Sequence, residues 1–275
     1  MSKLSHSLKA LISAPHARAG TTRAPRNIVE IYRGVAQNGA GQGVSMPAWL
    51  TMSTAATMTM NSPESLLELF KVSQGHTSAR SFVQTAELMR EVGLKCISFN
   101  GIPRTINCLG AFMEGLPVEV SRAMSTEQSR QVTSANADQI VSRGKALWDS
   151  IYRPFENKLV EKLAQSHPNL PIHILSAHYG GMLSDPQPNM PVNVGRVLTS
   201  IVAIACLRSQ TGVGPQVMSH VFGLRKAFED GSAESDVKGG RWLATDEGTE
   251  WILNSIDDIV RTFGGTSYAP TSANW

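Results

Sequence analysis

The stretch that most constrains the fold runs from Gly195 to Gly231 and joins an apolar segment, a polar turn and a periodic segment. The first segment, 197–206, is apolar nearly all round, which is typical of a helix buried on every side. Pro215 suits the first turn of a second helix, because its missing N–H would have no partner there. In that helix apolar residues recur at offsets of four, three and four, at Val217, Val221, Leu224 and Phe228. These features predict two packed helices joined by a Gly-Pro turn, with His220 near the joint.

Helix patterns dominate the rest of the chain, and strand patterns are scarce. One helix start is marked by three successive residues. Ser62 is the N-cap, Pro63 is the first helical residue, and the negative charge of Glu64 is favourable at a helix N-terminus. The alternating prolines of 185–191 exclude both a helix and a central strand there. Periodic apolar residues predict further helices at 26–38, 49–60, 78–99, 103 onward, 137–148, 154–165, 172–178 and 247–263. We therefore expect an all-α fold.

Two stretches are predicted to be connections. The glycines of 39–43 end the helix at 26–38 and form a flexible linker, since a Gly-x-Gly-x-Gly run without a preceding strand is a weak phosphate-loop signal. The polar segment 117–138 holds a capping-box pattern at Ser125-x-x-Gln128. A boundary near residue 130 then gives four parts: an N-terminal extension at 1–45, a first helical half at 46–130, a second half at 131–265 and a tail at 266–275.

The composition is that of an ordinary soluble protein, with 41% hydrophobic and 17% charged residues. A formal net charge of +3 does not indicate a nucleic-acid partner, which usually requires a basic stripe across the folded domain. The longest apolar run, between Arg196 and Arg208, is shorter than the roughly 18 residues that a membrane span needs. We expect no nucleic-acid and no membrane partner.

The first 22 residues contain no acidic residue and carry two lysines. Four aliphatic residues recur there at helical spacing: Leu4, Leu8, Leu11 and Ile12. An amphipathic, basic, acid-poor segment is typical of a mitochondrial transit peptide, and the alternative is an opening helix that packs on the domain. We expect a cytoplasmic protein, with the mitochondrion as the alternative compartment.

The three cysteines, Cys96, Cys108 and Cys206, are widely spaced, and no two form a Cys-x-x-Cys pair. This spacing offers neither a local redox pair nor a zinc knuckle. We expect buried thiols in a reducing compartment, because free cysteine is among the most buried residue types. A bridge between Cys96 and Cys108 would require the fold to bring them together.

Two blocks of the sequence resemble carboxymuconolactone decarboxylases, members of the alkylhydroperoxidase D-like (AhpD-like) superfamily. The first block reads Leu88-x-Arg90-Glu91-Val92 … Phe99-Asn-Gly101-Ile-Pro103-Arg104-x-x-Asn107. The second reads Arg196-Val-Leu198-Thr-x-Ile-Val-Ala … Ser219-His220-Val221-x-x-Leu224 … Gly231. The whole chain also resembles a set of fungal proteins in this superfamily. The resemblance implies an all-α fold with two pseudo-repeated halves, assembled into a homo-oligomer, usually a trimer or hexamer.

The sequence departs from the peroxidase branch of this superfamily, which places a Cys-x-x-Cys pair ahead of its histidine and uses a relay glutamate. The histidine matches His220, but the cysteine positions hold Val213 and Gln216. No Asp or Glu occurs between Pro186 and Phe228. The Cys-x-x-Cys peroxidase mechanism is therefore excluded.

Basic and polar residues remain as candidates for the site. A neutral His220 would act as general acid and base, with Arg196 and Arg104 holding an anion and Asn107, Gln216 and His178 binding substrate. The structural alternatives are a core histidine bonded to a backbone carbonyl, Arg104 acting as a cap or pairing with Glu91, and Arg196 holding a helix start. His173 and His178 are five residues apart, a poor helical spacing for one metal ion, and no acidic residue is near them, so we expect no metal. No cofactor is expected.

Three functions follow from these residues. The first is a carboxymuconolactone decarboxylase-like enzyme that acts on a small, anionic organic acid or lactone in a pocket at His220. The second is a non-catalytic oligomeric protein that keeps the fold and has lost its site. The third is a thiol peroxidase that uses one of the three remote cysteines, which would require an exposed thiol of low pKa.

Overall fold

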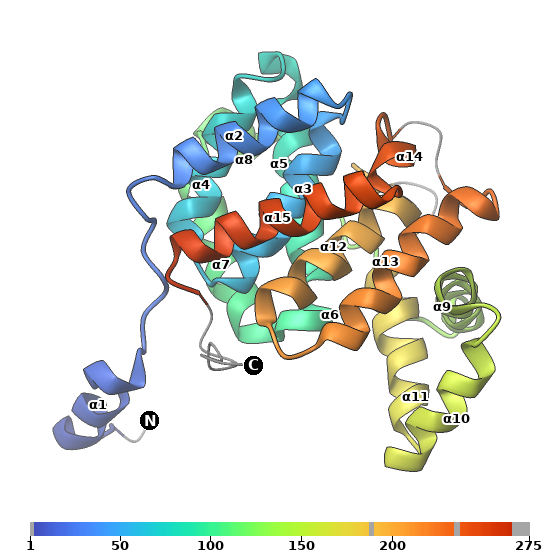
Figure 1. Ribbon diagram of the computed structural model, residues 1–275. Helices are drawn as coiled ribbons and strands as arrows, with labels where there is room; N and C mark the ends of the chain where they lie inside the picture. The colour runs from blue at the N-terminus through green and yellow to red at the C-terminus, as the bar shows by residue number, and fades with distance from the viewer. Residues whose placement is uncertain (1–2, 187–189, 234–236, 266–275) are drawn as a thin grey trace, which may run out of the picture.

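The computed structural model describes residues 3–186, 190–233 and 237–265, and this part of the chain is helical with no strand (Figure 1). The first half of the chain forms α1 (His6–Ile12), α2 (Ile28–Gly41), α3 (Met46–Thr59), α4 (Pro63–Gln74), α5 (Phe82–Lys95), α6 (Ile97–Asn100), α7 (Ile102–Gly115) and α8 (Val118–Ala123). Then come α9 (Ala137–Tyr152), α10 (Glu156–Ser166), α11 (Leu170–His173), the π-helix η3 (Ile174–Leu183), α12 (Gly195–Gln210), α13 (Gly214–Glu229), α14 (Gly240–Leu243) and α15 (Asp246–Thr262). Short 3₁₀ turns are η1 (Pro15–Ala17) and η2 (Ala79–Ser81). The expected all-α class is confirmed.

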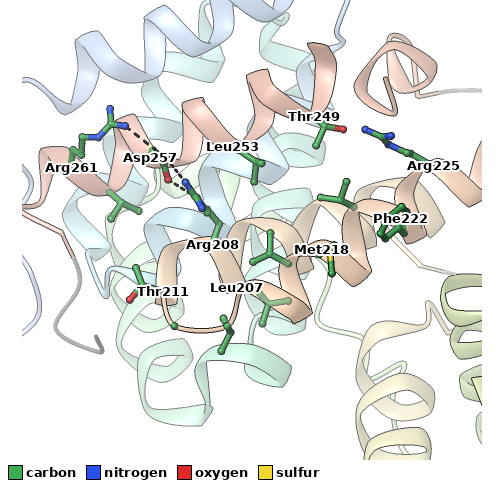
Figure 2. Close-up of a pocket in the computed structure, with 16 residues that line it drawn as sticks. Leu207, Arg208, Thr211, Met218, Phe222, Arg225, Thr249, Leu253, Asp257 and Arg261 are labelled. Atoms are coloured by element: carbon green, nitrogen blue, oxygen red, sulfur yellow. Dashed lines mark hydrogen bonds and ion pairs between the residues drawn. The ribbon is translucent and has the colours of Figure 1, made fainter. Parts of the chain in front are cut away.

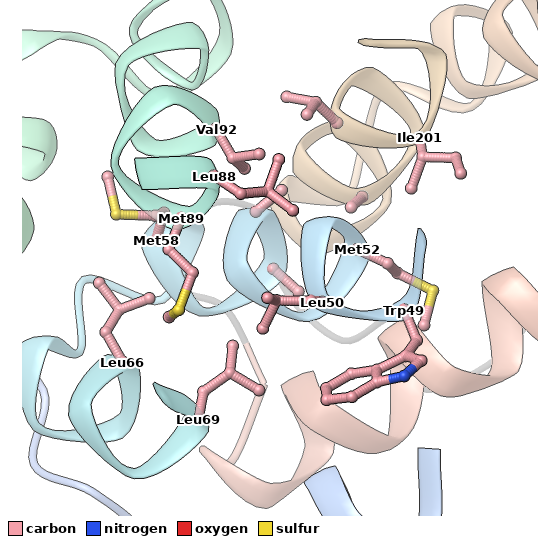
Figure 3. Packing of buried hydrophobic residues seen from close by; sticks show 14 of the residues in the cluster. Trp49, Leu50, Met52, Met58, Leu66, Leu69, Leu88, Met89, Val92 and Ile201 are labelled. Atoms are coloured by element: carbon pink, nitrogen blue, oxygen red, sulfur yellow. The ribbon is translucent and has the colours of Figure 1, made fainter. Parts of the chain in front are cut away.

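The centre of the molecule is the contact between α3 and α12, which are buried on nearly every side. Apart from Arg196 and Arg208 near the ends of α12, both sequences are uncharged and mostly apolar or small, so neighbours can cover each helix nearly all round. Figure 3 shows side chains of α3 in the centre of the core, with Met52 on the side of Ile201 from α12, Leu50 toward Leu69 of α4 and Met58 near Met89 of α5. The amphipathic helix α15 covers this pair with Ile252, Ile256 and Ile259. The helix pair predicted from Gly195 to Gly231 is present as α12 and α13.

A second, smaller cluster forms where α9 packs against η3, around Trp148, Ile151, Tyr179 and Leu183. The two backbones approach closely at two glycines. A Cβ placed on Gly144 would lie 2.5 Å from the backbone nitrogen of Gly180, inside any tolerable contact. Glycine at this crossing therefore lets α9 and η3 pack backbone to backbone.

Helix α2 runs further than the sequence predicts. It continues through Gly39 and Gly41, and the left-handed turn comes at Gly43, whose φ is +72°. A Cβ on Gly39 would lie 3.1 Å from the Trp251 ring, so this glycine gives α15 room to approach α2. The prediction of a flexible linker over 39–43 was wrong because packing against Trp251 offsets the low helix propensity of glycine.

The segment between the predicted halves also differs from expectation. Residues 118–123 form α8, and no helix starts at Ser125, where the capping box was predicted. Instead Ser125 is held on α5: its backbone N–H donates to Glu87 Oε1 at 2.6 Å, and its carbonyl accepts from Arg90 at 2.9 Å. The tail predicted at 266–275 lies outside the described residues, and the boundary near residue 130 stays a prediction.

Helix α1 stands apart from the body of the molecule (Figure 1). None of its residues is buried, and Leu8, Leu11 and Ile12 of the helix are exposed, as is Leu4 just before it. The alternative of an opening helix packed on the domain is therefore wrong within this chain. No helix among the described residues has the length and apolar character needed to cross a membrane.

A buried ionic contact fastens α12 to α5. The ammonium of Lys95 is 0% exposed and lies 2.6 Å from Asp185 Oδ1, and it also donates to the carbonyl of Leu183. The second oxygen of Asp185 accepts the backbone N–H of Gly195 at 2.6 Å, at the start of α12. Burial lowers the pKa of Lys95, and the carboxylate of Asp185 opposes that shift. This pair fixes three segments to one another.

Lys95→Met should lower the free energy of unfolding by about 3 kcal/mol or more, because it leaves Asp185 as a buried charge without its cation. The matched control is Lys71→Met, which removes an exposed ion pair with Glu68 and should cost about 1 kcal/mol or less. Urea denaturation of both variants measures the difference. Equal stabilities of the two variants would contradict a structural role for the buried pair.

Gly144→Ala should destabilise the protein by about 2 kcal/mol, because the new methyl group meets the backbone of η3. Gly110→Ala on α7 is the control, since a Cβ there meets no atom within 4 Å. That substitution should leave stability unchanged or raise it by about 0.5–1 kcal/mol, because alanine favours helix. Thermal melting checks both. A Gly144→Ala protein as stable as the wild type would show that α9 and η3 can separate without loss.

Candidate functional site

His220 lies on the inward face of α13, and only 4% of its surface is exposed. Its Nε2 is 3.4 Å from the hydroxyl of Tyr152 on α9, and that hydroxyl is 3.0 Å from the hydroxyl of Tyr179 on η3. The ring of Phe99 stands edge-on to the imidazole at 6.2 Å between centroids. An imidazole and two phenols thus form a short chain of hydrogen-bonding groups inside an aromatic enclosure.

The electrostatic environment keeps this chain uncharged. Burial, with a smaller contribution from the cation of Arg196, lowers the pKa of His220 to about 4. Burial also raises the pKa of Tyr152 and of Tyr179. At neutral pH the imidazole is therefore neutral and both phenols keep their protons. Nδ1 of His220 is buried and has no hydrogen-bond partner among the described residues, so one ring nitrogen is left to donate or accept according to the tautomer.

Arg196 is buried at the start of α12 and binds groups of the protein itself. Its guanidinium donates to Oγ and the carbonyl of Ser150 at 2.8 and 3.2 Å, to Oγ of Ser200 at 2.5 Å and to the carbonyl of Gly223 at 2.7 Å. These bonds connect α12 with α9 and α13, the two helices that carry Tyr152 and His220. Arg196 therefore positions the site and lowers the pKa of the imidazole through its charge.

A hollow of about 470 Å³ opens between α13 and the α9–α10 corner, and we call it the Tyr152 hollow. It is lined by Ile151, Tyr152, Pro154, Phe155, Lys158, Leu159, Lys162, Ser219, Phe222 and Lys226. This lining contains three lysines and no carboxylate, so its charge favours an anion. Lys226 is anchored by donating to the carbonyl of Ile151 at 3.2 Å, and Lys158 and Lys162 are exposed at the mouth. Tyr152 is the residue that both lines this hollow and contacts His220.

Arg104 and Asn107 are placed around Asn61. Arg104 donates to the carbonyl of Thr59 at 2.6 Å, and Asn107 donates to Oδ1 of Asn61 at 3.3 Å. Arg104 and Asn61 line a separate polar hollow of about 480 Å³ together with Arg18. Arg104 therefore acts as a cap at the end of α3, one of the two alternatives predicted for it, while Glu91 forms its ion pair with Arg130. Arg104 and Asn107 thus share one polar surface, while the contacts of His220 described above come from α6, α9 and η3.

The remaining predicted site residues lie at the surface or near it. Gln216 is exposed in the first turn of α13, and His178 is half-buried on η3. The rings of His173, the last residue of α11, and His178 on η3 stand edge-on, 5.2 Å between centroids. The two histidines are thus neighbours despite a spacing of five residues. Within the described residues, no group of three or more His, Cys, Asp or Glu side chains is placed to hold a metal.

All three cysteines are buried and unbridged. Sγ of Cys96 lies 3.5 Å from Sγ of Cys206, so the fold pairs Cys96 with Cys206 rather than with Cys108. Burial raises the pKa of Cys96 well above its ordinary value and that of Cys108 to about 12. A thiol peroxidase needs an accessible thiol of low pKa, whereas burial makes Cys96 and Cys108 inaccessible and raises their pKa values. The thiols are placed as packing residues.

Tyr152, Tyr179 and the lysines of the Tyr152 hollow were not among the site residues predicted from the sequence. The one available signal was the aromatic and aliphatic face of α9, Trp148, Ile151 and Tyr152, ahead of the basic spacing Lys158-x-x-x-Lys162 on α10. A face of this kind is also typical of ordinary helix packing, so the pattern alone does not indicate a site.

The buried imidazole predicts a pH dependence of stability. Because the pKa of His220 is about 4 in the folded protein against an ordinary 6.5, the unfolded chain binds more protons between these values. The contribution of His220 to stability is then complete above about pH 6.5 and falls as the pH is lowered toward 4, by at most about 1.4 kcal/mol per pH unit. Urea denaturation between pH 4 and 7 should show a shallower dependence for His220→Gln than for the wild type. Parallel curves would show that His220 is protonated alike in both states.

Comparisons with protein-family models, with curated proteins and with solved structures gave no match to this chain.

Proposed function

We propose that this chain is a carboxymuconolactone decarboxylase-like, AhpD-like enzyme that acts on a small anionic organic acid or lactone by acid–base chemistry at His220 and Tyr152. One observation carries the proposal. A buried, neutral imidazole with an unpartnered nitrogen contacts a tyrosine that lines a lysine-bordered hollow free of carboxylates. Buried polar atoms without partners are uncommon in folded proteins and are a reason to look for a ligand.

The hollow supplies binding, and its inner wall supplies proton transfer. A substrate carboxylate would be held at Lys158, Lys162 and Lys226, where no acidic group competes for the cations. The protonated hydroxyl of Tyr152 would donate a hydrogen bond to the negative charge that develops on a substrate oxygen. His220, neutral above about pH 4, would exchange a proton with that hydroxyl. Arg196 acts through both residues as a positioning group.

The fold supports the family assignment in a general way. The central pair consists of one helix from each predicted half, α3 from 46–130 and α12 from 131–265. Exposed aliphatic residues on α7 and α8, among them Ile102, Ile106 and Val118, offer a surface for a homo-oligomer, which we propose to be a trimer or hexamer. A fungal protein of this superfamily is the assignment that the sequence resemblance favours.

A second candidate function is that of a non-catalytic assembly protein. The observation that favours it is the enclosure of His220: Phe99, Tyr152 and Tyr179 surround the ring, and His220 lines none of the hollows described here. In this case His220 and the tyrosines would stabilise the junction of α9, η3 and α13. The two candidates differ in whether Tyr152 acts on a ligand in the hollow.

Tyr152→Phe separates the candidates, because it removes one hydroxyl and keeps the ring. In a screen of lactones and unsaturated carboxylic acids, turnover of the best substrate should fall by about 10²–10³-fold, with KM changed little. Lys158→Gln and Lys162→Gln should instead raise KM. The matched control is Lys145→Gln, an exposed lysine on α9 paired with Asp149. A folded Tyr152→Phe protein with unchanged turnover would rule out the enzymatic role of this site.

A further inference from the structure

A third cavity lies between α13 and α15, and we call it the α13–α15 groove (Figure 2). Its volume is about 630 Å³, within the range of about 300–1,000 Å³ that small-molecule sites occupy. Most of its lining is apolar: Leu207, Val213, Val217, Met218, Val221, Phe222, Leu253 and Val260. Met218 and Phe222 are 57% and 53% exposed, so the groove presents a hydrophobic wall to solvent.

The charged residues of the groove are placed unevenly. At one end Arg208 holds Asp257 through two bonds, Nε to Oδ1 at 2.8 Å and a terminal nitrogen to Oδ2 at 2.7 Å. Arg261 also lies 3.8 Å from Asp257. Figure 2 shows these three side chains together, joined by dashed lines. The carboxylate at this end is therefore shared between two cations.

Arg225 lies apart from that cluster, with its guanidinium directed toward Thr249 (Figure 2). Its acidic partner, Asp246, is 79% exposed and does not line the groove. Nε of Arg225 is buried and has no hydrogen-bond partner among the described residues. A buried donor without an acceptor is unfavourable, and an acceptor brought by a ligand would remove that penalty.

We infer that the α13–α15 groove binds an aliphatic carboxylate, with the acid group at Arg225 and the hydrocarbon chain along Val221, Met218 and Leu253. The apolar lining removes the chain from water, and a guanidinium is the side chain best suited to hold a carboxylate through two parallel hydrogen bonds. The lining carries three arginines and one carboxylate, so its charge complements an anion. Neither His220 nor Tyr152 lines this groove, so binding here does not depend on the proposed acid–base chemistry.

The test compares sodium decanoate with its uncharged methyl ester, by isothermal titration and by the shift of the melting temperature of the full chain. Decanoate should bind and raise the melting temperature, with the ester at least about tenfold weaker, as expected for loss of a charge-assisted bond. Arg225→Gln should weaken decanoate by the same factor and leave the ester unchanged. Arg33→Gln, an exposed arginine on α2, is the matched control and should bind decanoate like the wild type.

Val221→Trp, which fills the groove, should abolish binding of both compounds, with circular dichroism used to confirm the fold. If that variant does not fold, the comparison of Arg225→Gln with the wild type decides alone. Equal affinity for decanoate and its ester, or an unaffected Arg225→Gln protein, would overturn the inference. Failure of the wild type to bind decanoate would overturn it too. A dimer detected by light scattering would then indicate that a second copy covers the groove. These measurements follow binding in the α13–α15 groove and do not require turnover at Tyr152 as a readout.

Discussion

The packing of α3 against α12 is the constraint on which the rest of the structure depends. Both helices are buried nearly all round, so each needs covering helices on every side before it is removed from water. Helices α2, α4, α5 and α15 supply that cover around α3, and α13 and α15 supply it around α12. The orientation of α13, and with it the inward direction of His220, follows from this arrangement.

One guanidinium links that core to the candidate site. Arg196 lies on α12 and binds Ser150 on α9 and Gly223 on α13. These bonds hold α13, which carries His220, and α9, which carries Tyr152, to the central helix pair. The charge of Arg196 then lowers the pKa of a histidine that burial has already disfavoured as a cation. Arg196, which was predicted from the sequence to hold an anion, thus helps to position the imidazole and adds to the effect of burial on its pKa.

Much of the fold could be predicted because it depends on local periodicity. The helices at 49–60, 197–206 and 215–228 were expected from their apolar patterns and are present as α3, α12 and α13. The continuation of α2 through Gly39 could not be predicted, since the reason is Trp251, more than two hundred residues away along the chain. The π-helix η3 was not predicted either, and its close contact with α9 depends on Gly144 and Gly180, which come from two separate segments.

The site was predictable only in part. His220 stood out because it lies in an acid-free stretch beside a helix joint, and the structure places it with Arg196. Tyr152 and Tyr179 come from distant segments with no recognisable pattern, and only the packing of α9 on η3 brings their hydroxyls to 3.0 Å. Arg104 and Asn107 are gathered at Asn61 instead, because the carbonyl of Thr59 at the end of α3 accepts the arginine. Contacts between side chains of different helices depend on how the helices cross, and the spacing of residues in the sequence does not predict that.

Phe222 has a consequence beyond its place in α13. Its ring lines both the Tyr152 hollow and the α13–α15 groove, and it is half exposed between them. Because the ring forms part of both walls, an occupant that displaced it would change the shape of both cavities and so couple their affinities. Such a coupling is reciprocal: whatever factor the first occupant imposes on the second, the second imposes on the first.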